Sequence, residues 1–477
     1  MIAETEGPTR PDVPRDDKPA CECGVFGIYG TRNAAELTYF GLYALQHRGQ
    51  ESAGIAVSNG ERIVAHKGMG EIAEVFPDRD VMQTLAGHAA IGHNRYSTTG
   101  SSSLGNAQPL LMKFRYRQMA AAHNGNITNA GELKTYLEQG GAIFQSSSDS
   151  ELVLHLYARS RKRGTAAKLA EALSRFVGAY CFVILTEEEL IAARDPLGFR
   201  PLSLGKYNGA WVVASETCAF DIIGARYVRD IAPGEVLAIS RHGLRSSFLP
   251  RTDKRAFCIF EHIYFARPDS MIFTENVDKV RRRLGRQLAR EHPAEADIVI
   301  SVPDSSNTAA LGYAEESGLK LEVGLIRNHY VGRTFILPDQ KLRDLDVKIK
   351  FNPVRGVLRG KRVVIVDDSI VRGTTARKLV RMIRAAGARE VHFRIASPPI
   401  ISPCFYGIDM PTKGELIASQ RSVDAIRRHL GVDSLGYLSL KGMLSLSTHP
   451  ANSFCTACFS GRYPTRINRR SGKLALG

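Results

Sequence analysis

The chain lacks several features that would restrict its class. No apolar run is long enough to cross a bilayer, which argues against a membrane protein. Cysteine is scarce, with 8 in 477 residues, so we expect no disulfide framework and a reducing, cytoplasmic location. The first twenty residues have neither the apolar core of a signal peptide nor an Arg- and Ser-rich transit pattern, which predicts a disordered leader.

The basic excess does not come with a nucleic-acid-binding motif. The formal net charge is +16, but the basic residues are scattered and no aromatic-rich RNA-binding motif accompanies them. We therefore expect no nucleic-acid partner, and a phosphate-rich substrate explains part of the charge. Five basic residues close the chain without an acidic one, which fits either a solvated tail or contact with an acidic partner: Arg462, Arg466, Arg469, Arg470 and Lys473.

The length and the change of pattern along the chain predict two domains. A chain of 477 residues exceeds what one hydrophobic core usually serves. Residues 23–250 alternate short strand-like runs, Gly-rich turns and helices, which predicts an α+β sandwich. The polar segment 250–256 marks a boundary. Residues 257–477 alternate helices with parallel-type strands, the order of a doubly wound α/β sheet.

Helical periodicity locates several elements. In the first half, helices are predicted near residues 34–47, 130–138, 150–160 and 166–175. In the second half, one helix has an apolar face and an arginine face. The apolar face comprises Val277, Val280, Leu284 and Leu288, and the arginines, predicted to be solvated, are Arg281, Arg282, Arg283 and Arg286.

The segment Val363 to Thr375, VVIVDDSIVRGTT, joins a buried strand, two adjacent carboxylates and a small-residue loop that leads into a helix. Such a loop presents unpaired backbone N–H groups and the helix dipole to an anion. Asp367 and Asp368 stand at the carboxyl end of the strand, where they can accept hydrogen bonds from ribose hydroxyls and approach a metal. For the strand alone, an ordinary doubly wound strand with a polar tip is the alternative.

The whole segment resembles the loop that binds phosphoribosyl pyrophosphate (PRPP) in the phosphoribosyltransferase family. This resemblance implies a type I phosphoribosyltransferase domain whose PRPP site is formed by Asp367, Asp368, Ser369, Gly373, Thr374 and Thr375. The string from Ile300 to Gly318 resembles the pyrophosphate-binding loop of that family, and it implies that Ser306 joins the two aspartates around Mg²⁺. A helix N-cap is the alternative role for Ser306. The long polar connection from Asn328 to Gly356 corresponds to a mobile lid in the family.

Five motifs occur in order in the first half of the chain: CGVFGIYG, QHRGQESAG, GHNRYSTTG, AHNGNITN and SSSDSE. Together they resemble the glutamine amidotransferases with an N-terminal nucleophile (Ntn) cysteine, whose domain is an αββα sandwich. The resemblance implies that residues 1–22 are a cleaved propeptide and that Cys23 is both the nucleophile and, through its α-amino group, the general base. Cys21 lacks the GVFG sequence that follows Cys23, so it is assigned to the leader. By itself, a cysteine at a strand start is more often a small buried residue.

The same resemblance assigns roles to four further residues. Arg95 is implied to bind the α-carboxylate of glutamine, and Asp149 its α-ammonium group. Asn124 and the backbone N–H of Gly125 are implied to form the oxyanion hole. Each has an alternative: Arg95 could form a surface ion pair, Asp149 could belong to a helix capping box, and Asn124 with Gly125 could form a hairpin turn.

The remaining cysteines form a second pattern. Cys455 and Cys458 are a two-spaced pair, a spacing that fits zinc, a cluster, a redox couple or plain packing. Cys181 and Cys218, inside apolar strands, are predicted core residues. With their flanking residues, four positions resemble the cysteines of those amidophosphoribosyltransferases that carry a [4Fe-4S] cluster. The implied ligands of this structural cluster are Cys258, Cys404, Cys455 and Cys458.

From about Cys23 to Pro464 the chain resembles the amidophosphoribosyltransferases. The resemblance implies that ammonia is released from L-glutamine at the first site and displaces pyrophosphate from PRPP at the second. The product would be phosphoribosylamine, formed in the first committed step of purine synthesis. Purine nucleotides are implied as feedback inhibitors, and a homo-oligomer, commonly a tetramer, as the assembly.

Two other function classes fit parts of the sequence. A non-catalytic PRPP-sensing regulator that binds nucleic acid would tolerate the charge of +16, but it would have no use for the glutaminase motifs. An amidotransferase could instead deliver ammonia to another acceptor, such as a hexose phosphate or an aspartyl adenylate. The segment VVIVDDSIVRGTT argues against that acceptor class.

Overall fold

The computed structural model describes residues 23–96, 102–114, 117–250, 252–329 and 349–467. These residues group into two compact units. One contains the chain up to Arg281 together with Ser402–Met410 and the segment that follows Met443. The other contains Arg282–Ile401 and Pro411–Met443. The boundary predicted from the sequence lies at residues 250–256, whereas the first compact unit extends to Arg281.

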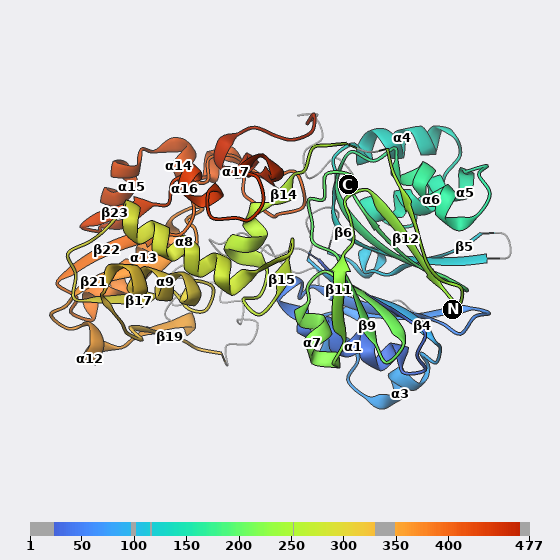
Figure 1. The fold of residues 1–477 in the computed structure, drawn as a ribbon, viewed down its shortest axis with the longest axis horizontal. Coiled ribbons are helices and arrows are strands. Elements are labelled where there is room, and N and C mark those ends of the chain that lie inside the picture. Colours follow the sequence, from blue (N-terminus) through green and yellow to red (C-terminus); the bar gives the residue numbers. More distant parts are fainter. Residues whose placement is uncertain (1–22, 97–101, 115–116, 251, 330–348, 468–477) are drawn as a thin grey trace. The chain divides into compact units, whose positions relative to one another are not determined.

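Two antiparallel sheets form the centre of the first unit (Figure 1). One has the order β11-β9-β10-β1-β4-β2-β3, with β1 (Gly24–Tyr29), β2 (Ser52–Ser58), β3 (Ile63–Met69), β4 (Ala89–Arg95), β9 (Ser203–Tyr207), β10 (Ala210–Ala214) and β11 (Arg226–Asp230). The other has the order β13-β12-β8-β7-β6-β5, with β5 (Leu110–Phe114), β6 (Arg117–Ile127), β7 (Gly178–Thr186), β8 (Leu190–Arg194), β12 (Glu235–Ser240) and β13 (Gly243–Phe248).

Helices cover the outer faces of both sheets, and the central strands β1, β4, β7 and β8 are therefore buried on both sides. One core cluster contains side chains of both sheets, among them Val25, Ile91 and Val183. On the outer face of the first sheet, α1 (Ala34–Ala44) and α7 (Cys218–Ile223) share a cluster with its strands. On the outer face of the second sheet lie α4 (Ala130–Gln139), α5 (Leu152–Arg159) and α6 (Thr165–Leu173) (Figure 1). This arrangement confirms the predicted αββα sandwich.

Short elements connect these layers: η1 (Gln46–Arg48), α2 (Ile72–Val75), α3 (Arg79–Gln83), η2 (Leu104–Asn106) and η3 (Asp149–Glu151). Short elements also join distant parts of the first unit. β14 (Phe257–Cys258) pairs in parallel with β24 (Phe454–Cys455). Around this pair lie the π-helix η4 (Glu261–Phe265), β15 (Met271–Ile272), β16 (Glu275–Asn276), η6 (Ala451–Ser453) and α17 (Ala457–Ser460).

The second unit is built on a parallel sheet with the order β18-β17-β21-β22-β23. Its strands are β17 (Ile298–Ser301), β18 (Lys320–Leu321), β21 (Arg362–Asp367), β22 (Glu390–Ile395) and β23 (Ser434–Tyr437). The other elements are α9 (Asn307–Ser317), β19 (Leu325–Arg327), β20 (Phe351–Pro353), α12 (Arg355–Leu358), α13 (Thr374–Ala385), η5 (Lys413–Glu415), α14 (Ile417–Gln420) and α15 (Val423–Leu430). Helix α16 (Leu440–Leu444) ends where this unit meets the other in sequence.

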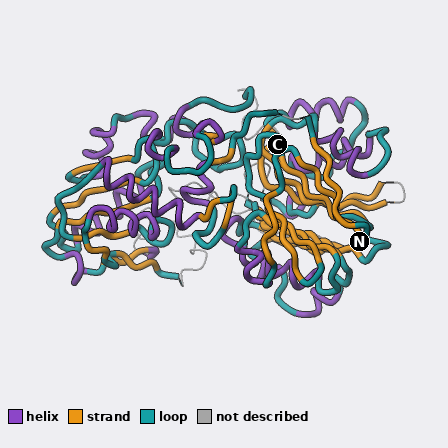
Figure 2. The backbone as a smooth tube through the Cα atoms, viewed as in Figure 1, coloured by secondary structure: helices purple, strands orange, loops and turns teal. Residues whose placement is uncertain are grey.

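Both faces of the parallel sheet are buried. Helices α13 and α15 share a core cluster with Val363 and Ile365, which lie on one face of β21. Val364 and Val366 alternate with them, face the opposite side and are also fully buried, while α9 packs against β17 and β21. The strands and helices of this alternating order can be followed in Figure 2. The predicted doubly wound sheet is therefore confirmed.

One prediction on the arginine face of helix α8 (Val277–Glu291) is wrong. Arg281 is only 2% exposed, because its guanidinium donates to the carbonyls of His262 and Ala266, each at 2.8 Å. Arg282 and Arg286 do lie at the surface, where they pair with Glu315. The bonds of Arg281 tie the start of α8 to the π-helix of the first unit. Within the described ranges, no helix combines the length and the apolar character needed to cross a membrane.

Candidate functional site

Cys23 directly precedes β1, the central strand between β10 and β4. Its thiol donates to the carbonyl of Tyr96 at 3.6 Å. Burial raises the pKa of the Cys23 thiol to about 11, against the opposing effects of the Tyr96 bond and the Arg95 charge. The charges of Glu51 and Asp149 raise it further. At neutral pH the thiol is therefore protonated and needs a base before it can attack.

Arg95 lies at the end of β4, where its side chain is only 4% exposed. Its guanidinium pairs with the carboxylate of Glu51, and the two backbones are also joined by a 3.0 Å hydrogen bond from Glu51 N–H to the Arg95 carbonyl. The alternative of an ion pair is thus correct in part, but the pair is buried beside Cys23 rather than at the surface. A buried guanidinium next to a thiol can bind a carboxylate of a substrate.

Asp149 begins η3, and its carboxylate turns toward β6. It accepts the backbone N–H of Ile127 at 2.9 Å, and Nδ1 of His123 lies 3.6 Å away. Burial acts to raise the pKa of Asp149, but His123 and the hydrogen bonds outweigh it and hold the pKa below its usual value. The capping-box alternative is correct only in part. Ser148 caps η3 by accepting the Ser150 N–H at 3.3 Å, but Glu151 instead accepts the N–H groups of Gln145 and Ser146.

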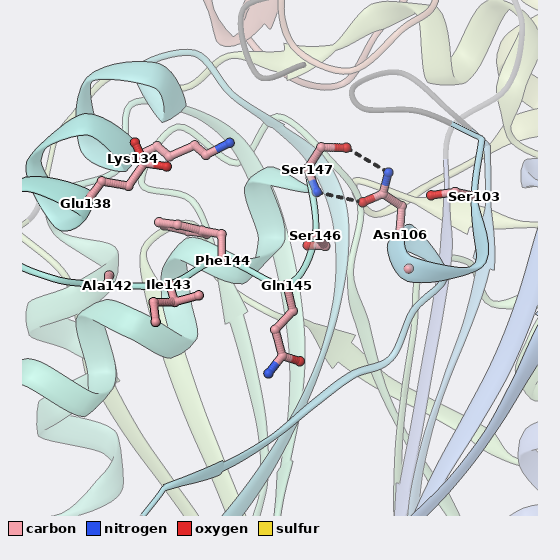
Figure 3. Close-up of a pocket in the computed structure, with 11 residues that line it drawn as sticks. Ser103, Asn106, Lys134, Glu138, Ala142, Ile143, Phe144, Gln145, Ser146 and Ser147 are labelled. Atoms are coloured by element: carbon pink, nitrogen blue, oxygen red, sulfur yellow. Dashed lines mark hydrogen bonds between the residues drawn. The ribbon is translucent and has the colours of Figure 1, made fainter. Parts of the chain in front are cut away.

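The loop that leads to Asp149 lines an open pocket of about 530 Å³ (Figure 3). In this pocket Ser147 and Asn106 are joined by two hydrogen bonds, of 2.8 and 2.9 Å. None of the predicted site residues lines it. The hydrogen bonds between Asn106 and Ser147 hold the segment that precedes Asp149.

Asn124 and Gly125 lie inside β6, opposite Cys181 and Tyr180 of β7, so the hairpin-turn alternative is wrong. The side chain of Asn124 is fully buried, and neither its nitrogen nor its oxygen has a hydrogen-bond partner among the described residues. Gly125 has φ +143°, and a Cβ there would lie 2.1 Å from the carbonyl oxygen of Ala179. A buried amide without a partner can bind a ligand atom, and only glycine fits beside it.

Ser306 and the two aspartates meet at the carboxyl ends of β17 and β21. The Ser306 hydroxyl donates to Asp367 at 2.9 Å and lies 3.4 Å from Asp368. Asp368 also accepts the hydroxyls of Ser305 at 2.5 Å and Ser369 at 2.7 Å. Ser306 stands at the N-cap position of α9, but its side chain makes no capping bond there. The N-cap alternative is therefore wrong for the hydroxyl.

The rest of the predicted PRPP loop follows Asp368 directly. Gly373 is the N-cap of α13 with φ +82°, and Thr374 and Thr375 open the helix. The first N–H groups of this 12-residue helix point out of its start, where an anion is favoured. A side chain at position 373 would meet Ile417 at 2.8 Å. Of the predicted lid, residues 330–348 lie outside the described residues.

The structure also groups the four cysteines that resemble cluster ligands. β14 and β24 set Cys258 opposite Cys455. The charges of Cys455, Cys258 and Cys404 all act to raise the pKa of Cys458, after burial as the largest cause. All four are free thiols. Cys181 and Cys218 are buried in core clusters, as predicted, but Cys218 begins helix α7, so the strand predicted around it is wrong. Cys21 lies outside the described residues.

The residues of both regions suit the implied inorganic groups. No group of three or more His, Cys, Asp or Glu side chains among the described residues could hold a metal ion by itself. For Mg²⁺ this fits, because two carboxylates leave the other positions to substrate oxygens. For a cluster it also fits, because its four ligands surround a larger body than one ion and must be thiols without disulfide partners. Three of these thiols are buried, and Cys404 is partly exposed.

Sequence reasoning missed three residues at these sites. Glu51 pairs with Arg95, His123 approaches Asp149, and Ser305 binds Asp368. Each stands inside a segment that resembles a family motif: Glu51 in QHRGQESAG, His123 in AHNGNITN, and Ser305 in the string from Ile300 to Gly318. Only their residue types could have indicated these roles, because a charged or hydroxyl side chain near a site residue can form an ion pair or a hydrogen bond with it.

Comparison with known proteins gives a consistent result. The family model of the glutamine amidotransferase domain matches residues 93–221. The amidophosphoribosyltransferase of Bacillus subtilis (strain 168) is 52% identical over 451 residues, which cover 94% of each chain. The amidophosphoribosyltransferase of Synechococcus elongatus is 50% identical over 460 residues, covering 95% of this chain and 93% of that one.

Solved structures agree with the sequence relatives. A structure described as the allosteric regulatory enzyme of purine biosynthesis has a TM-score of 0.91 at 51% identity, and the match covers 95% of this chain and 98% of that one. Glutamine PRPP amidotransferase from B. subtilis, complexed with ADP and GMP, has a TM-score of 0.91 at 50% identity, covering 95% and 100%. With this identity over nearly its whole length, the chain belongs to the amidophosphoribosyltransferase family.

Proposed function

We propose that this protein is a glutamine-dependent amidotransferase that forms 5-phosphoribosylamine from PRPP, with release of glutamate and pyrophosphate. One observation carries the proposal: a single chain holds a thiol site with flanking charges at Cys23 and a hydroxyl–carboxylate site at Ser306 and Asp367. The relatives of about 50% identity are named for this reaction. The second site favours PRPP over other ammonia acceptors, because paired carboxylates suit ribose hydroxyls and a phosphate-bound cation.

At the first site, the thiol of Cys23 attacks the side-chain amide carbon of glutamine. Because the pKa of this thiol is about 11, a base must take its proton, and an α-amino group at Cys23 would titrate near neutral pH. Removal of residues 1–22 would create that amine. Arg95 binds the α-carboxylate of glutamine, and Asp149, kept ionised by His123, binds the α-ammonium group.

The attack turns the amide oxygen into an oxyanion. The unpartnered side-chain amide of Asn124 and the N–H of Gly125 supply donors for it, in a site from which the buried strands exclude water. Collapse of the intermediate releases ammonia and leaves a thioester, which water hydrolyses to glutamate. Ammonia is then consumed at the second site, where it displaces pyrophosphate from C1 of PRPP.

At the second site, Asp367 and Asp368 accept the ribose hydroxyls, and the start of α13 receives the 5′-phosphate of the substrate. Ser306 and these two carboxylates would hold Mg²⁺, which neutralises charge on the leaving pyrophosphate. Cys258, Cys404, Cys455 and Cys458 would hold a [4Fe-4S] cluster with a structural role.

The proposal includes the assembly and its control. A relative is complexed with ADP and GMP, and we expect purine nucleotides to inhibit this protein too. We also expect a homotetramer in the cytoplasm, without a nucleic-acid partner. Light scattering of the purified protein measures the assembly, and a dimer or monomer would contradict it.

The direct test uses purified protein with glutamine, PRPP and Mg²⁺. Glutamate and pyrophosphate should appear in equal amounts, and omission of PRPP should abolish pyrophosphate formation. Amination of a hexose phosphate, or release of AMP from an aspartyl adenylate, without pyrophosphate from PRPP, would favour the other acceptor class.

A further inference from the structure

We propose that the segment Cys404–Gly407 is a positioning element of the glutaminase site, which holds the oxyanion-hole peptide of β6 in place. The inference rests on the proposed role of Asn124 and Gly125. Residues 402–410 belong to the same compact unit as β6, although they stand far from it in sequence. Within this unit, two contacts join the segment to β6 directly.

The first contact is a hydrogen bond. The side-chain N–H of Asn126 donates to the carbonyl of Phe405 at 2.9 Å, across 279 positions of sequence. Asn126 follows Gly125 directly in β6. This hydrogen bond fixes β6 at Asn126. It therefore limits movement of the strand next to Gly125, whose positive φ departs from ordinary strand geometry.

The second contact is a close backbone approach. Gly407 has φ +105°, and a Cβ at this position would lie 3.0 Å from the carbonyl carbon of Gly125 and 3.2 Å from its oxygen. The Gly407 backbone therefore packs against the peptide that leaves Gly125. A shift of this peptide changes ψ of Gly125. Because both ends of β6 are held in the sheet, φ of Gly125 must change with it, which turns the preceding peptide and its N–H, the one that would face the oxyanion.

The segment is itself held rigidly. Arg200 is fully buried and donates to the carbonyl of Tyr406 at 2.6 Å, and its guanidinium also lies 3.5 Å from Glu261. The Tyr406 ring stacks on Phe199 with centroids 4.2 Å apart. The Tyr406 backbone N–H donates to the sulfur of Cys404 at 3.3 Å. Because these contacts hold the segment Cys404–Gly407 in a close-packed environment, a small displacement of the segment would also displace β6.

These contacts lead to a specific kinetic expectation. Removing an oxyanion donor costs about 10²–10³ in kcat, so displacing one should cost less, about tenfold. Of the groups proposed to bind glutamine, Arg95 stands on β4, and Asp149 stands in η3 and contacts β6 at Ile127 and His123 rather than at the Gly125 peptide. We therefore expect kcat for glutamine hydrolysis to fall while KM stays within about threefold. This separation distinguishes positioning from loss of substrate binding.

The main test replaces Gly407 by alanine, with Gly209→Ala as the matched control. Both glycines have positive φ, +105° and +90°, so both substitutions carry the same kind of backbone cost. A Cβ at 209 meets nothing within 4 Å, whereas a Cβ at 407 meets Gly125. Glutaminase kcat and KM, the ammonia-dependent rate, visible absorption and Tm are measured for each.

We expect Gly407→Ala to lose about tenfold in glutaminase kcat, with the ammonia-dependent rate and the visible absorption unchanged. Gly209→Ala should retain the parental kcat. Equal kcat for the two variants would overturn the inference. So would a parallel fall of the ammonia-dependent rate in Gly407→Ala, which indicates general disruption.

A second variant keeps the inference testable if Gly407→Ala does not fold. Asn126→Asp keeps the shape of the side chain but replaces the donor to Phe405 by an acceptor. Its glutaminase kcat should also fall at nearly constant KM, and an unchanged kcat would refute the inference. Failure of the proposed function is a different result, since the parental protein would then hydrolyse glutamine without making phosphoribosylamine.

Discussion

The hydroxyl of Ser306 lies 2.9 Å from Oδ1 of Asp367, although Ser306 follows β17 and Asp367 ends β21 of the parallel sheet. Carboxyl ends of adjacent parallel strands meet at one edge, which is where ligands of doubly wound sheets bind. Both side chains are buried, so this bond fixes the carboxylate before a substrate arrives. The proposed PRPP site is thus preorganised by its own residues.

The Asp367 carboxylate should be required for use of PRPP but not for use of glutamine. We expect Asp367→Asn to lower ammonia-dependent synthesis by about 100-fold or more, because an amide binds a ribose hydroxyl and a cation less well. Glutamine hydrolysis measured without PRPP should not change. Asp424→Asn is the control, since Asp424 lies in the same unit but pairs with Arg427 and Arg428 at the surface. Full activity of Asp367→Asn would remove this residue from the site.

The two reactions should separate at Cys23. Replacing Cys23 by alanine removes the proposed nucleophile, so glutamine-dependent synthesis should fall to background while ammonia-dependent synthesis remains. Both rates are measured by pyrophosphate release. Cys218→Ala, which removes a buried thiol from a core cluster, should retain both. Equal loss of the two activities in Cys23→Ala would mean that the thiol serves the architecture instead.

The reactivity of Cys23 should report whether the leader has been removed. With the leader attached, a thiol pKa of about 11 leaves about one thiol in ten thousand ionised near pH 7. Because the pKa is raised, alkylation of Cys23 should accelerate about tenfold for each pH unit up to that pKa. After removal of residues 1–22, the α-amine can accept the proton, so fast alkylation should begin near neutral pH. Mass spectrometry of iodoacetamide-treated protein gives both the rate and the N-terminus, and identical profiles for the two forms would contradict this.

The four grouped cysteines should be needed for iron and for stability. Cys455→Ser should lower bound iron and visible absorption, and it should lower Tm, because the cluster would join β24 to β14 and to the segment at Cys404. The measurement is iron content and thermal unfolding of protein purified without oxygen. Cys218→Ala should keep the iron. A colourless parental protein would show that these thiols only pack.

Much of the fold could be predicted because periodicity and local pattern agree. The predicted helix near residues 130–138 is α4 (Ala130–Gln139), and VVIVD forms β21 as expected. The helix predicted at 150–160 begins only at Leu152, because Asp149–Glu151 first form a 3₁₀ turn that serves the site. Helical spacing places Arg281 on the apolar face, four residues after Val277 and three before Leu284, but its charge favoured an exposed position. Only its tertiary partners reveal the hydrogen bonds that allow its burial.

The sequence motifs predicted candidate site residues but not the geometry that joins them. The motifs named Arg95, Asp149 and Ser306, yet no spacing rule indicates that Arg95 pairs with Glu51 or that Ser306 binds Asp367. The contact between Asn126 and Phe405 is even harder to predict from local sequence patterns, because the two residues are 279 positions apart. Such contacts depend on how elements pack, which a sequence pattern does not encode.

The most direct measurement follows the amide nitrogen of glutamine. The protein is supplied with [amide-¹⁵N]glutamine, PRPP and Mg²⁺ in the presence of excess unlabelled ammonium, and the trapped phosphoribosylamine is analysed by mass spectrometry. We expect most of the product to carry ¹⁵N, because nitrogen released at Cys23 is consumed at the PRPP site without mixing with the solvent. Unlabelled product, or glutamate released without pyrophosphate, would contradict this.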